Sequence, residues 1–405
     1  MLKLPIYLDN NATTQMDARV LETMTPYFLE HFGNAASRNH PFGWEAEEAV
    51  EIAREQVAKL IGAEPKEIIF TSGATEADNL GIKGIYEMYE SKGNHIITAT
   101  TEHKAVLDTC RHIEKMGGEV TYLKVNAEGL ISLTELEAAI KPTTILVAIM
   151  YANNEIGTIQ PIKEISAIAR KHGALVFTDA TQAVGKIPVD VNSDGIDLMA
   201  FTSHKMYGPK GVGALYVRKK NPRVKVTAQI DGGGHERGMR SGTLNVPGIV
   251  GFGKACELCR LDMEDDTKRI AILRDKLESS LLQLEEAYVN GSREHRLPHV
   301  SNISFKHVEG EGLLMGFNKN IALSSGSACT SASLEPSYVL KALGLGDDLA
   351  HSSLRFGLGR FTTEEQIDYT IKAISDTVLK LREMSPLWEM FKEGVDLSKI
   401  EWAAH

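Results

Sequence analysis

The sequence predicts an α/β protein in which a mainly parallel sheet forms a large domain and a smaller α+β domain accompanies it. Two observations support this prediction. From about residue 45 to about residue 260, short apolar runs alternate with helix-like segments, which is typical of a parallel sheet with helices on both faces. After about residue 262 the pattern changes to a charged helix followed by separate strand-like runs. We therefore expect a large domain at 16–261 and a small domain at 1–15 and 262–405.

Five apolar runs are expected to form the buried strands of the sheet. They read EIIFTSG, HIITATTEH, ILVAIMYAN, ALVFTDA and GIDLMAFTSHK, at 67–73, 95–103, 145–153, 174–180 and 195–205. Short apolar runs of this kind are typical of strands buried on both faces.

Helix signals separate these strands. Helical patterns occupy 45–62 and 161–173, and Gly173 is the expected end of the second. Two capping boxes, Ser132 with Glu135 and Thr362 with Glu365, indicate the start of two further helices.

Composition and charge limit the class of protein. The chain has 405 residues, enough for one or two domains with a substantial core. Its formal net charge of −10 argues against direct binding of nucleic acid, which favours basic surfaces. The apolar run ILVAIMYA, from Ile145, is far shorter than the roughly 20 residues that span a bilayer, and the N-terminus shows no signal peptide. Four cysteines do not make a disulfide framework in so long a chain, so we expect a cytoplasmic protein without a membrane partner.

Charged residues follow two of the predicted strands, at the sheet edge where open α/β proteins bind ligands. Asp179 comes directly after one run, with Gln182 three residues later, and Lys205 follows another run. Isolated buried charges are unfavourable, so Asp179 and Lys205 need either each other or a ligand. These residues alone fit a structural ion pair as well as a ligand site.

A third strand end favours a phosphate site. The segment IIFTSGATEADNL passes from a strand through Gly73, Ala74 and Thr75 into a helix. Small residues let backbone N–H groups approach an anion, and the N-terminus of a helix favours negative charge. By itself this is also the pattern of an ordinary glycine turn with a threonine cap. Combined with the polar side chains at the end of the 195–205 run, this turn predicts a phosphate-binding cup that includes Thr202, Ser203 and His204.

A phosphate group, a lysine that forms a Schiff base and a carboxylate that holds a pyridinium nitrogen describe one cofactor, pyridoxal phosphate. The segments DATQ, TSHK and GAT together resemble the class V aminotransferase group of fold-type I pyridoxal phosphate enzymes. The segments YLDNNATT, TEHKAV, NNEIG, GGGHERGMRSGT and SSGSACTS resemble the cysteine desulfurases. The C-terminal tail, SPLWEMFKEGVDLSKIEWAAH, is similar to that of the housekeeping iron–sulfur-cluster type. The resemblance covers essentially the whole chain and implies the fold-type I architecture.

The resemblance implies a role for each matching residue. Lys205 would hold the cofactor as a Schiff base and later move protons, and Asp179 would pair with the pyridinium nitrogen. His103 would stack on the ring and exchange protons with the substrate. Arg355 would grip the substrate carboxylate with its bidentate fork, and its apolar neighbours indicate a semi-buried guanidinium. The remaining expected contacts are Gln182 and Asn154 near the ring oxygen, Asn154 also near the substrate, and, at the phosphate, Ala74, Thr75, Thr202, Ser203, His204 and Thr243 from the partner subunit of a homodimer.

A lone cysteine, Cys329, lies in the polar small-residue segment SSGSACTSAS. The resemblance identifies it as the nucleophile, whose thiolate would take the sulfur of L-cysteine, release L-alanine and carry a persulfide. The expected acceptors are an iron–sulfur scaffold protein and other proteins, docked through a tail that contains Trp388, Ile400 and Trp402. A second role for Cys329, as a transient ligand of a nascent iron–sulfur cluster, stays open.

Two alternatives remain open at the level of sequence. An aminotransferase or a selenocysteine lyase on the same scaffold would also need Lys205 and Asp179, and only the nucleophilic thiol argues against a transaminase. A docking platform without catalysis is disfavoured because both residues are present. Cys256 and Cys259, in KACELCRLD, are expected to pack in a helix rather than bind zinc, and Cys110 is expected in the core.

Overall fold

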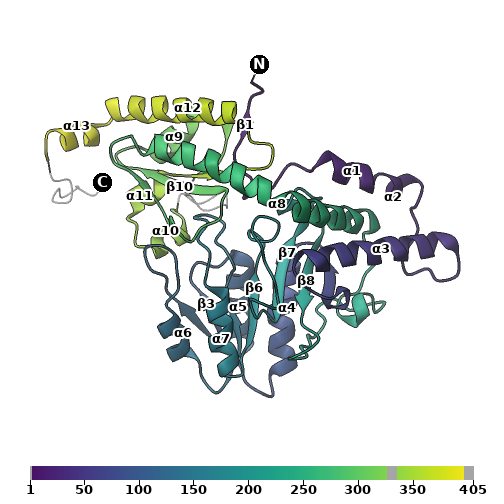
Figure 1. Cartoon of the computed structure of the whole chain (residues 1–405). Coiled ribbons are helices and arrows are strands. Elements are labelled where there is room, and N and C mark those ends of the chain that lie inside the picture. Colours follow the sequence, from purple (N-terminus) through teal and green to yellow (C-terminus); the bar gives the residue numbers. More distant parts are fainter. Residues whose placement is uncertain (1, 326–334, 396–405) are drawn as a thin grey trace.

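The computed structural model describes residues 2–325 and 335–395. A seven-stranded sheet lies at its centre, with helices on both faces and a second group of strands and helices at one end (Figure 1). The strands of the central sheet, in spatial order, are β2 (Ile68–Thr71), β8 (Gly213–Val217), β7 (Leu198–Thr202), β6 (Leu175–Asp179), β5 (Thr144–Ala148), β3 (His95–Ala99) and β4 (Glu119–Leu123). The predicted fold class is therefore confirmed.

The five expected strands all belong to the central sheet. Strands β7, β6, β5, β3 and β4 pair in parallel, so their carboxyl ends meet at one edge. Strand β8, which sequence analysis did not identify, lies between β2 and β7 and runs antiparallel to both. A glycine is needed where β8 begins, because a Cβ atom on Gly213 would lie 2.8 Å from the backbone of Gly73.

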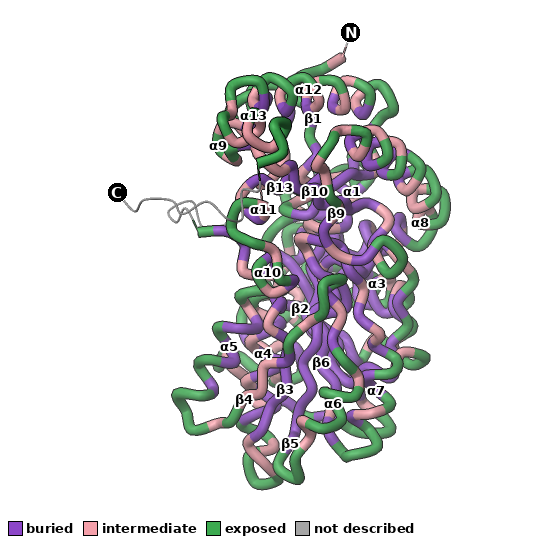
Figure 2. Tube along the Cα trace, turned by 90° about the vertical axis from the view of Figure 1, so that its left-hand side faces the viewer, coloured by how far each residue is buried: buried purple, intermediate pink, exposed green. Residues whose placement is uncertain are grey.

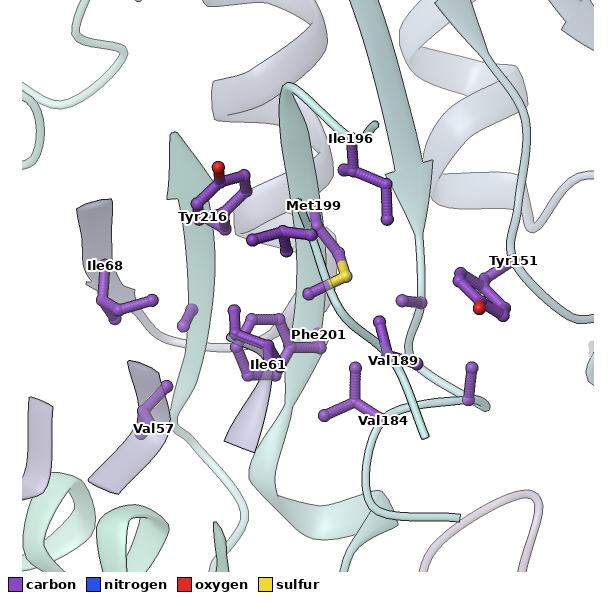
Figure 3. Packing of buried hydrophobic residues seen from close by; sticks show 14 of the residues in the cluster. Val57, Ile61, Ile68, Tyr151, Val184, Val189, Ile196, Met199, Phe201 and Tyr216 are labelled. Carbon is purple, nitrogen blue, oxygen red and sulfur yellow. The ribbon is translucent and has the colours of Figure 1, made fainter. Parts of the chain in front are cut away.

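Helices cover both faces of the sheet: α4 (Ala74–Tyr89) and α5 (Lys104–Lys115) on one face, and α3 (Pro41–Leu60), α6 (Leu133–Ala139), α7 (Ile162–Lys171) and the first half of α8 (Val246–Leu281) on the other. Alternate strand residues point to opposite faces, so each face has its own core. On β3, for example, Ile97 packs on the α3 side and Ile96 on the α4 side. Figure 3 shows part of the α3-side core, where Met199 and Phe201 of β7 lie near Tyr216 of β8.

Two of the predicted helix ends are confirmed. Gly173 follows α7 with a φ of +78°, a left-handed conformation that glycine adopts without strain. The hydroxyl of Ser132 accepts a hydrogen bond of 3.2 Å from the backbone N–H of Glu135 at the start of α6. Both signals are local, which explains why the sequence alone located them.

The predicted capping box at Thr362 and Glu365 is wrong by one residue. Helix α12 (Glu364–Glu383) begins after Thr363, whose hydroxyl accepts from the N–H of Gln366 while the Gln366 side chain accepts from the N–H of Thr363. The hydroxyl of Thr362 instead accepts a hydrogen bond from the N–H of Gly359. This contact with the preceding turn removes Thr362 from the cap.

A second group of elements surrounds a four-stranded sheet formed, in spatial order, by β12 (Ser324–Ser325), β13 (Ser353–Gly357), β10 (Val300–Phe305) and β9 (Ala287–Val289). The N-terminal strand β1 (Ile6–Tyr7) joins this part of the chain by pairing in parallel with β11 (Ile321–Ala322). The remaining helices are α1 (Ala18–Met24), α2 (Pro26–Leu29), α9 (Gly310–Phe317), α10 (Tyr338–Ala342), α11 (Asp347–His351) and α13 (Pro386–Lys392).

Helix α8 links the two groups of elements (Figure 1). Phe252 and Cys256, in its first half, belong to the core of the central sheet, whereas Leu273 and Leu277, in its second half, pack in the core around β10 and β13. The expected domain boundary between residues 261 and 262 therefore falls inside one continuous helix. The division into two domains stays a prediction.

The strands form the buried interior and the helices expose their outer sides (Figure 2). Cys110, Cys256 and Cys259 are free thiols inside the core, as expected. Burial raises the pKa of the Cys110 thiol to about 12, so this side chain stays protonated and acts as an apolar group. Among the helices of residues 2–325 and 335–395, none combines the length and the hydropathy needed to cross a membrane.

A buried ion pair fixes the loop that contains the GGGHERG segment. Arg54, on α3, donates to both carboxylate oxygens of Glu236 at 2.8 Å, and both side chains are almost completely buried. Glu236 also accepts from the N–H of Phe70 on β2, and Arg54 also donates to the carbonyl of Ile68. The loop is therefore attached to the first strand of the central sheet.

Replacement of Glu236 by alanine should lower the free energy of unfolding by about 3 kcal/mol, because the guanidinium of Arg54 would stay buried without its main counter-charge. Urea denaturation of the purified chain measures this change. Glu264→Ala is the control, since Glu264 pairs with Lys268 on the exposed side of α8 and its loss should not change stability measurably. Equal unfolding midpoints for the two variants would contradict the prediction.

Candidate active site

A cavity of about 530 Å³ lies at the carboxyl edge of the central sheet. The predicted site residues that line it are Ala74, Thr75, His103, Asn154, Asp179, Gln182, Thr202, His204, Lys205 and Arg355. A larger groove of about 890 Å³ lies beside α5 and is lined by none of these residues. The parallel strands thus bring most of the predicted site together in one place.

Asp179 and Lys205 enter this cavity from neighbouring strands. Asp179 ends β6, is 5% exposed, and accepts a hydrogen bond of 2.9 Å from the N–H of Thr181. Lys205 ends a short 3-10 turn after β7, and its ammonium donates to the backbone carbonyls of Asn11 and, at 2.7 Å, Ala12. Both charged groups therefore face the same cavity, and each forms hydrogen bonds with backbone groups beside it.

The N-terminal segment forms one wall of the cavity, a role that sequence analysis did not assign. The carbonyl of Asn11 accepts a hydrogen bond of 3.0 Å from the side chain of Gln182, and the Asn11 amide donates to the carbonyl of Asn154 at 3.0 Å. These contacts join residues that are far apart in the chain. The conspicuous polar segment YLDNNATT was the available signal, but local rules do not reveal what it contacts.

The phosphate end of the expected site lies at the start of α4. Among residues 2–325 and 335–395, no side chain caps this helix and a Cβ atom placed on Gly73 would meet no atom within 4 Å, so the turn opens into space that these residues leave free. Thr75, Thr202 and His204 line the cavity at this end. The N-terminus of a long helix beside the hydroxyl of Thr75 and the imidazole of His204 suits a phosphate group, while the Thr202 hydroxyl donates to the carbonyl of Val212 at 3.1 Å.

Burial, followed by the positive charges of Lys205 and Lys210, lowers the pKa of the His204 imidazole to about 4. The ring is therefore neutral near pH 7. Its Nδ1 atom lies 3.1 Å from the hydroxyl of Thr13, and its backbone carbonyl accepts from the hydroxyl of Thr14. These contacts hold the imidazole beside the helix start.

Arg355 lines the same cavity from β13 and is 4% exposed. It donates to Asp9 at 2.7 Å, to the hydroxyl of Ser324 at 3.0 Å and to the carbonyl of Asn154 at 3.1 Å. The expected semi-buried guanidinium is confirmed, and Asp9 is a partner that sequence analysis did not identify. Within the described residues, Nε of Arg355 and Oδ1 of Asn154 are buried without a hydrogen-bond partner.

His103 begins α5 at the rim of the cavity. Its Nδ1 atom accepts a hydrogen bond of 3.1 Å from the N–H of Ala105. In the neutral ring, the proton therefore lies on Nε2. Nε2 is then available as a proton donor.

Two of the predicted residues that the structure describes, Ser203 and Thr243, do not line this cavity. The Ser203 side chain is completely buried and its hydroxyl lies toward Gly208, so its expected contact with the phosphate stays a prediction. Thr243 is exposed and lies outside the lining, which leaves its expected role across a subunit interface as a prediction. Cys329 lies in 326–334, outside the described residues.

The fit to pyridoxal phosphate follows from these observations. The uncapped helix start accommodates a phosphate, the buried carboxylate of Asp179 suits a pyridinium nitrogen, and Lys205 provides the amine. The unpartnered buried amide oxygen of Asn154 supports a ligand in the same space. The site is thus that of a pyridoxal phosphate enzyme of the fold-type I class.

Comparison with known proteins identifies the family. Residues 6–370 match the family model described as Aminotransferase class-V. "Cysteine desulfurase IscS" of Anaeromyxobacter sp. (strain Fw109-5) is 60% identical over 403 residues, covering 99% of each chain, and that of Actinobacillus succinogenes is 61% identical over 406 residues, covering 100% of each. A solved "NIFS-LIKE PROTEIN" is 40% identical with a TM-score of 0.87, covering 93% of this chain and 100% of that one. The NifS-like protein of Rickettsia africae is 31% identical with a TM-score of 0.82, covering 93% and 99%.

The chain belongs to the class-V aminotransferase family and, within it, to the cysteine desulfurases. This assignment confirms the predicted family and the predicted cofactor, pyridoxal phosphate. Metal binding has no comparable support: the described part of the chain contains no group of three or more His, Cys, Asp or Glu side chains arranged to hold a metal ion.

The lowered pKa of His204 predicts that its imidazole stays neutral from about pH 8 down to about pH 5 in the chain freed of cofactor. NMR titration of the chain with ¹³C-labelled histidine measures this directly, and His204→Gln assigns the resonance. A His204 resonance that titrates at the ordinary histidine pKa, about 6.5, would contradict the burial argument.

Proposed function

We propose that this chain converts L-cysteine to L-alanine, holds the sulfur as a persulfide on Cys329 and passes it to an iron–sulfur scaffold protein and other acceptors. The observation that carries this proposal is the convergence of Asp179, Lys205 and Arg355 on one cavity in a member of the cysteine desulfurase family. The three side chains match the three charged parts of the reaction: the ring nitrogen, the cofactor aldehyde and the substrate carboxylate.

Different residues of the cavity would hold the phosphate, the aldehyde and the ring of the cofactor. The start of α4 with Thr75, Thr202 and the neutral His204 would hold the phosphate, and Lys205 would hold the cofactor covalently. Asp179 would keep a proton on the ring nitrogen, because a buried carboxylate stabilises an adjacent positive charge. Bound pyridoxal phosphate supplies an electron sink that weakens the bonds around the substrate Cα and Cβ atoms.

Arg355 would bind the substrate carboxylate. Its fork is already oriented by Asp9 and Ser324, so little freedom is lost when the substrate binds. Nε has no hydrogen-bond partner within the described residues and is a donor that a carboxylate could use. The Asn154 side-chain oxygen would then lie between the substrate and the cofactor ring.

Two residues would move protons. Lys205, once released from the cofactor, would take the proton from the substrate Cα, because its amine lies in the same cavity as the substrate-binding Arg355. His103 would exchange a proton with the substrate through Nε2, because its Nδ1 is occupied by the N–H of Ala105.

Sulfur transfer would use the thiolate of Cys329. It attacks the substrate sulfur, and the new S–S bond forms as the substrate Cβ–S bond breaks. The electron pair released toward Cβ takes up a proton, which completes the methyl group of alanine. The persulfide remains on the protein until an acceptor thiolate attacks it.

Assembly and location are part of the same proposal. We infer a cytoplasmic homodimer in which Thr243 of each subunit completes the phosphate site of the other. Acceptor proteins would dock through the C-terminal tail. Trp388, on α13, packs on His307 and Phe391 and under the guanidinium of Arg382, so the tail would extend from a fixed base. Ile400 and Trp402 lie outside the described residues.

Cys329→Ser tests the proposed reaction. With L-cysteine, the variant should still change the visible cofactor spectrum but form neither alanine nor persulfide, because binding does not need the thiol and sulfur transfer does. Spectra, alanine assays and persulfide labelling measure the three steps. Lys205→Ala is the control and should lose the initial cofactor band. Alanine formation by Cys329→Ser at the wild-type rate would exclude Cys329 as the nucleophile.

Thr243 provides a test of the shared site. At limiting pyridoxal phosphate, Thr243→Ala should bind the cofactor about tenfold more weakly because one phosphate hydrogen bond is lost. A mixed dimer of Thr243→Ala and Lys205→Ala subunits should regain one complete site, since both substitutions then fall in the other site. Differently tagged subunits allow its purification. A mixed dimer no more active than its two parents would place Thr243 in its own subunit's site or outside both.

A further inference from the structure

A buried acid beside the cofactor cavity has no role in the proposed reaction. Asp78 lies in the second turn of α4, is 1% exposed and lines the same cavity as Asp179. Neither of its carboxyl oxygens has a hydrogen-bond partner within the described residues. An unpartnered buried carboxyl is unfavourable, so its presence on the cavity wall calls for a ligand, a water or a proton.

Asp78 belongs to a group of buried oxygens on the α4 face of the sheet. Asp179 points to this face because it shares the strand side of Phe177, which packs with Ala77 and Leu80 of α4. Glu102, which precedes α5, is completely buried; one of its oxygens accepts a hydrogen bond of 2.7 Å from the N–H of Met150 and the other has no partner in the described chain.

The three carboxyl groups cannot all be ionised. Burial raises the pKa of Asp78 well above its ordinary value, and the nearby charges of Asp179 and Glu102 raise it further. Burial likewise raises the pKa of Glu102. The titratable groups that change the pKa of Asp78 are thus Asp179, from β6, and Glu102, ahead of α5. Cys110 of α5 lies near Glu102, and its own raised pKa keeps its thiol protonated. Burial and the two neighbouring carboxylates therefore favour the neutral, protonated form of Asp78.

A neutral carboxyl group has a hydrogen that it can donate. The carboxylate of Asp179 is the charged group with the strongest electrostatic influence on Asp78, so it is the expected acceptor. Donation to a carboxylate stabilises its ionised form and lowers its affinity for a proton. These three acids form no metal-binding cluster in the described part of the chain, so a bound metal ion is not used to explain them.

We propose that Asp78 is a positioning residue that donates a hydrogen bond, through one buried water, to the carboxylate of Asp179. This contact keeps Asp179 ionised and oriented toward the ring nitrogen, so the proton stays on the ring. The inference rests on the proposed function of Asp179. It adds a residue on α4 that acts on the cofactor without touching it.

Two variants of the full-length holoenzyme test this inference. Asp78→Leu removes the donor and nearly preserves the volume, so cofactor release should become about tenfold more favourable and the absorption band of the bound cofactor should change its pH dependence. Asp78→Asn retains a neutral donor and should restore both properties to within about threefold of the wild type. Dialysis against buffer with measured free pyridoxal phosphate gives the affinities.

Two outcomes would overturn the proposal. If Asp78→Leu is folded and binds the cofactor with wild-type affinity and spectrum, Asp78 does not act on Asp179. Alternatively, Asp78→Asn could be as impaired as Asp78→Leu, in which case an ionised carboxylate, not a neutral donor, is required.

Stability gives a second measurement that needs no bound cofactor and remains informative if Asp78→Leu does not fold. A carboxyl whose pKa is raised in the folded chain contributes most below its unfolded pKa, about 3.9, and that contribution is lost as the pH rises. The wild-type chain should therefore lose stability relative to Asp78→Asn between about pH 4 and about pH 7. A pH-independent difference in urea midpoints would show that Asp78 holds no proton and would refute the inference.

The two tests separate this inference from the proposed function. If Cys329→Ser still makes alanine, the reaction is misassigned even when Asp78→Asn and Asp78→Leu behave as expected. If the sulfur chemistry is correct but the Asp78 variants match the wild type, only the role of Asp78 is lost.

Discussion

Parallel pairing of β5, β6 and β7 is the constraint on which the rest of this active site depends. Parallel strands end at the same edge of a sheet, so Asp179 after β6 and Lys205 after β7 reach one cavity from neighbouring strands. The antiparallel strand β8 extends this edge, because Gly213 allows it to approach the turn at Gly73. Apolar cores on both faces hold these strands in register, which makes the positions of the charged groups a property of the whole sheet.

The cavity collects charges that would be unfavourable one by one, and each is stabilised in a different way. Arg355 is paired with the carboxylate of Asp9. Lys205 is surrounded by backbone carbonyls of the N-terminal segment. For Asp78, burial and the charges of Asp179 and Glu102 raise the pKa, which favours proton uptake over ionisation. Ion pairing, carbonyl dipoles and proton uptake thus let one space contain groups for a cationic ring, an aldehyde and an anionic substrate.

Much of the site was predictable because its residues stand directly after strands or at a helix start. The five apolar runs located Asp179, Lys205 and the turn at Gly73. The direction of the Ser203 side chain could not be predicted, because a turn of three residues decides which side chains face the cavity, and its geometry is not evident from composition. Asp9 was not identified as the partner of Arg355, since the two are brought together only by the pairing of distant segments.

The sequence by itself determined five strands of the central sheet, the helix ends at Ser132 and Gly173 and the identity of the family, because these depend on periodicity, capping and motifs within short stretches of chain. The tertiary structure alone decided that the N-terminal segment forms a cavity wall, that α8 serves two cores and that Asp78 is buried near Asp179. These features arise from contacts between residues far apart in the chain. Such contacts form only when packing excludes water from both partners, which no local pattern specifies.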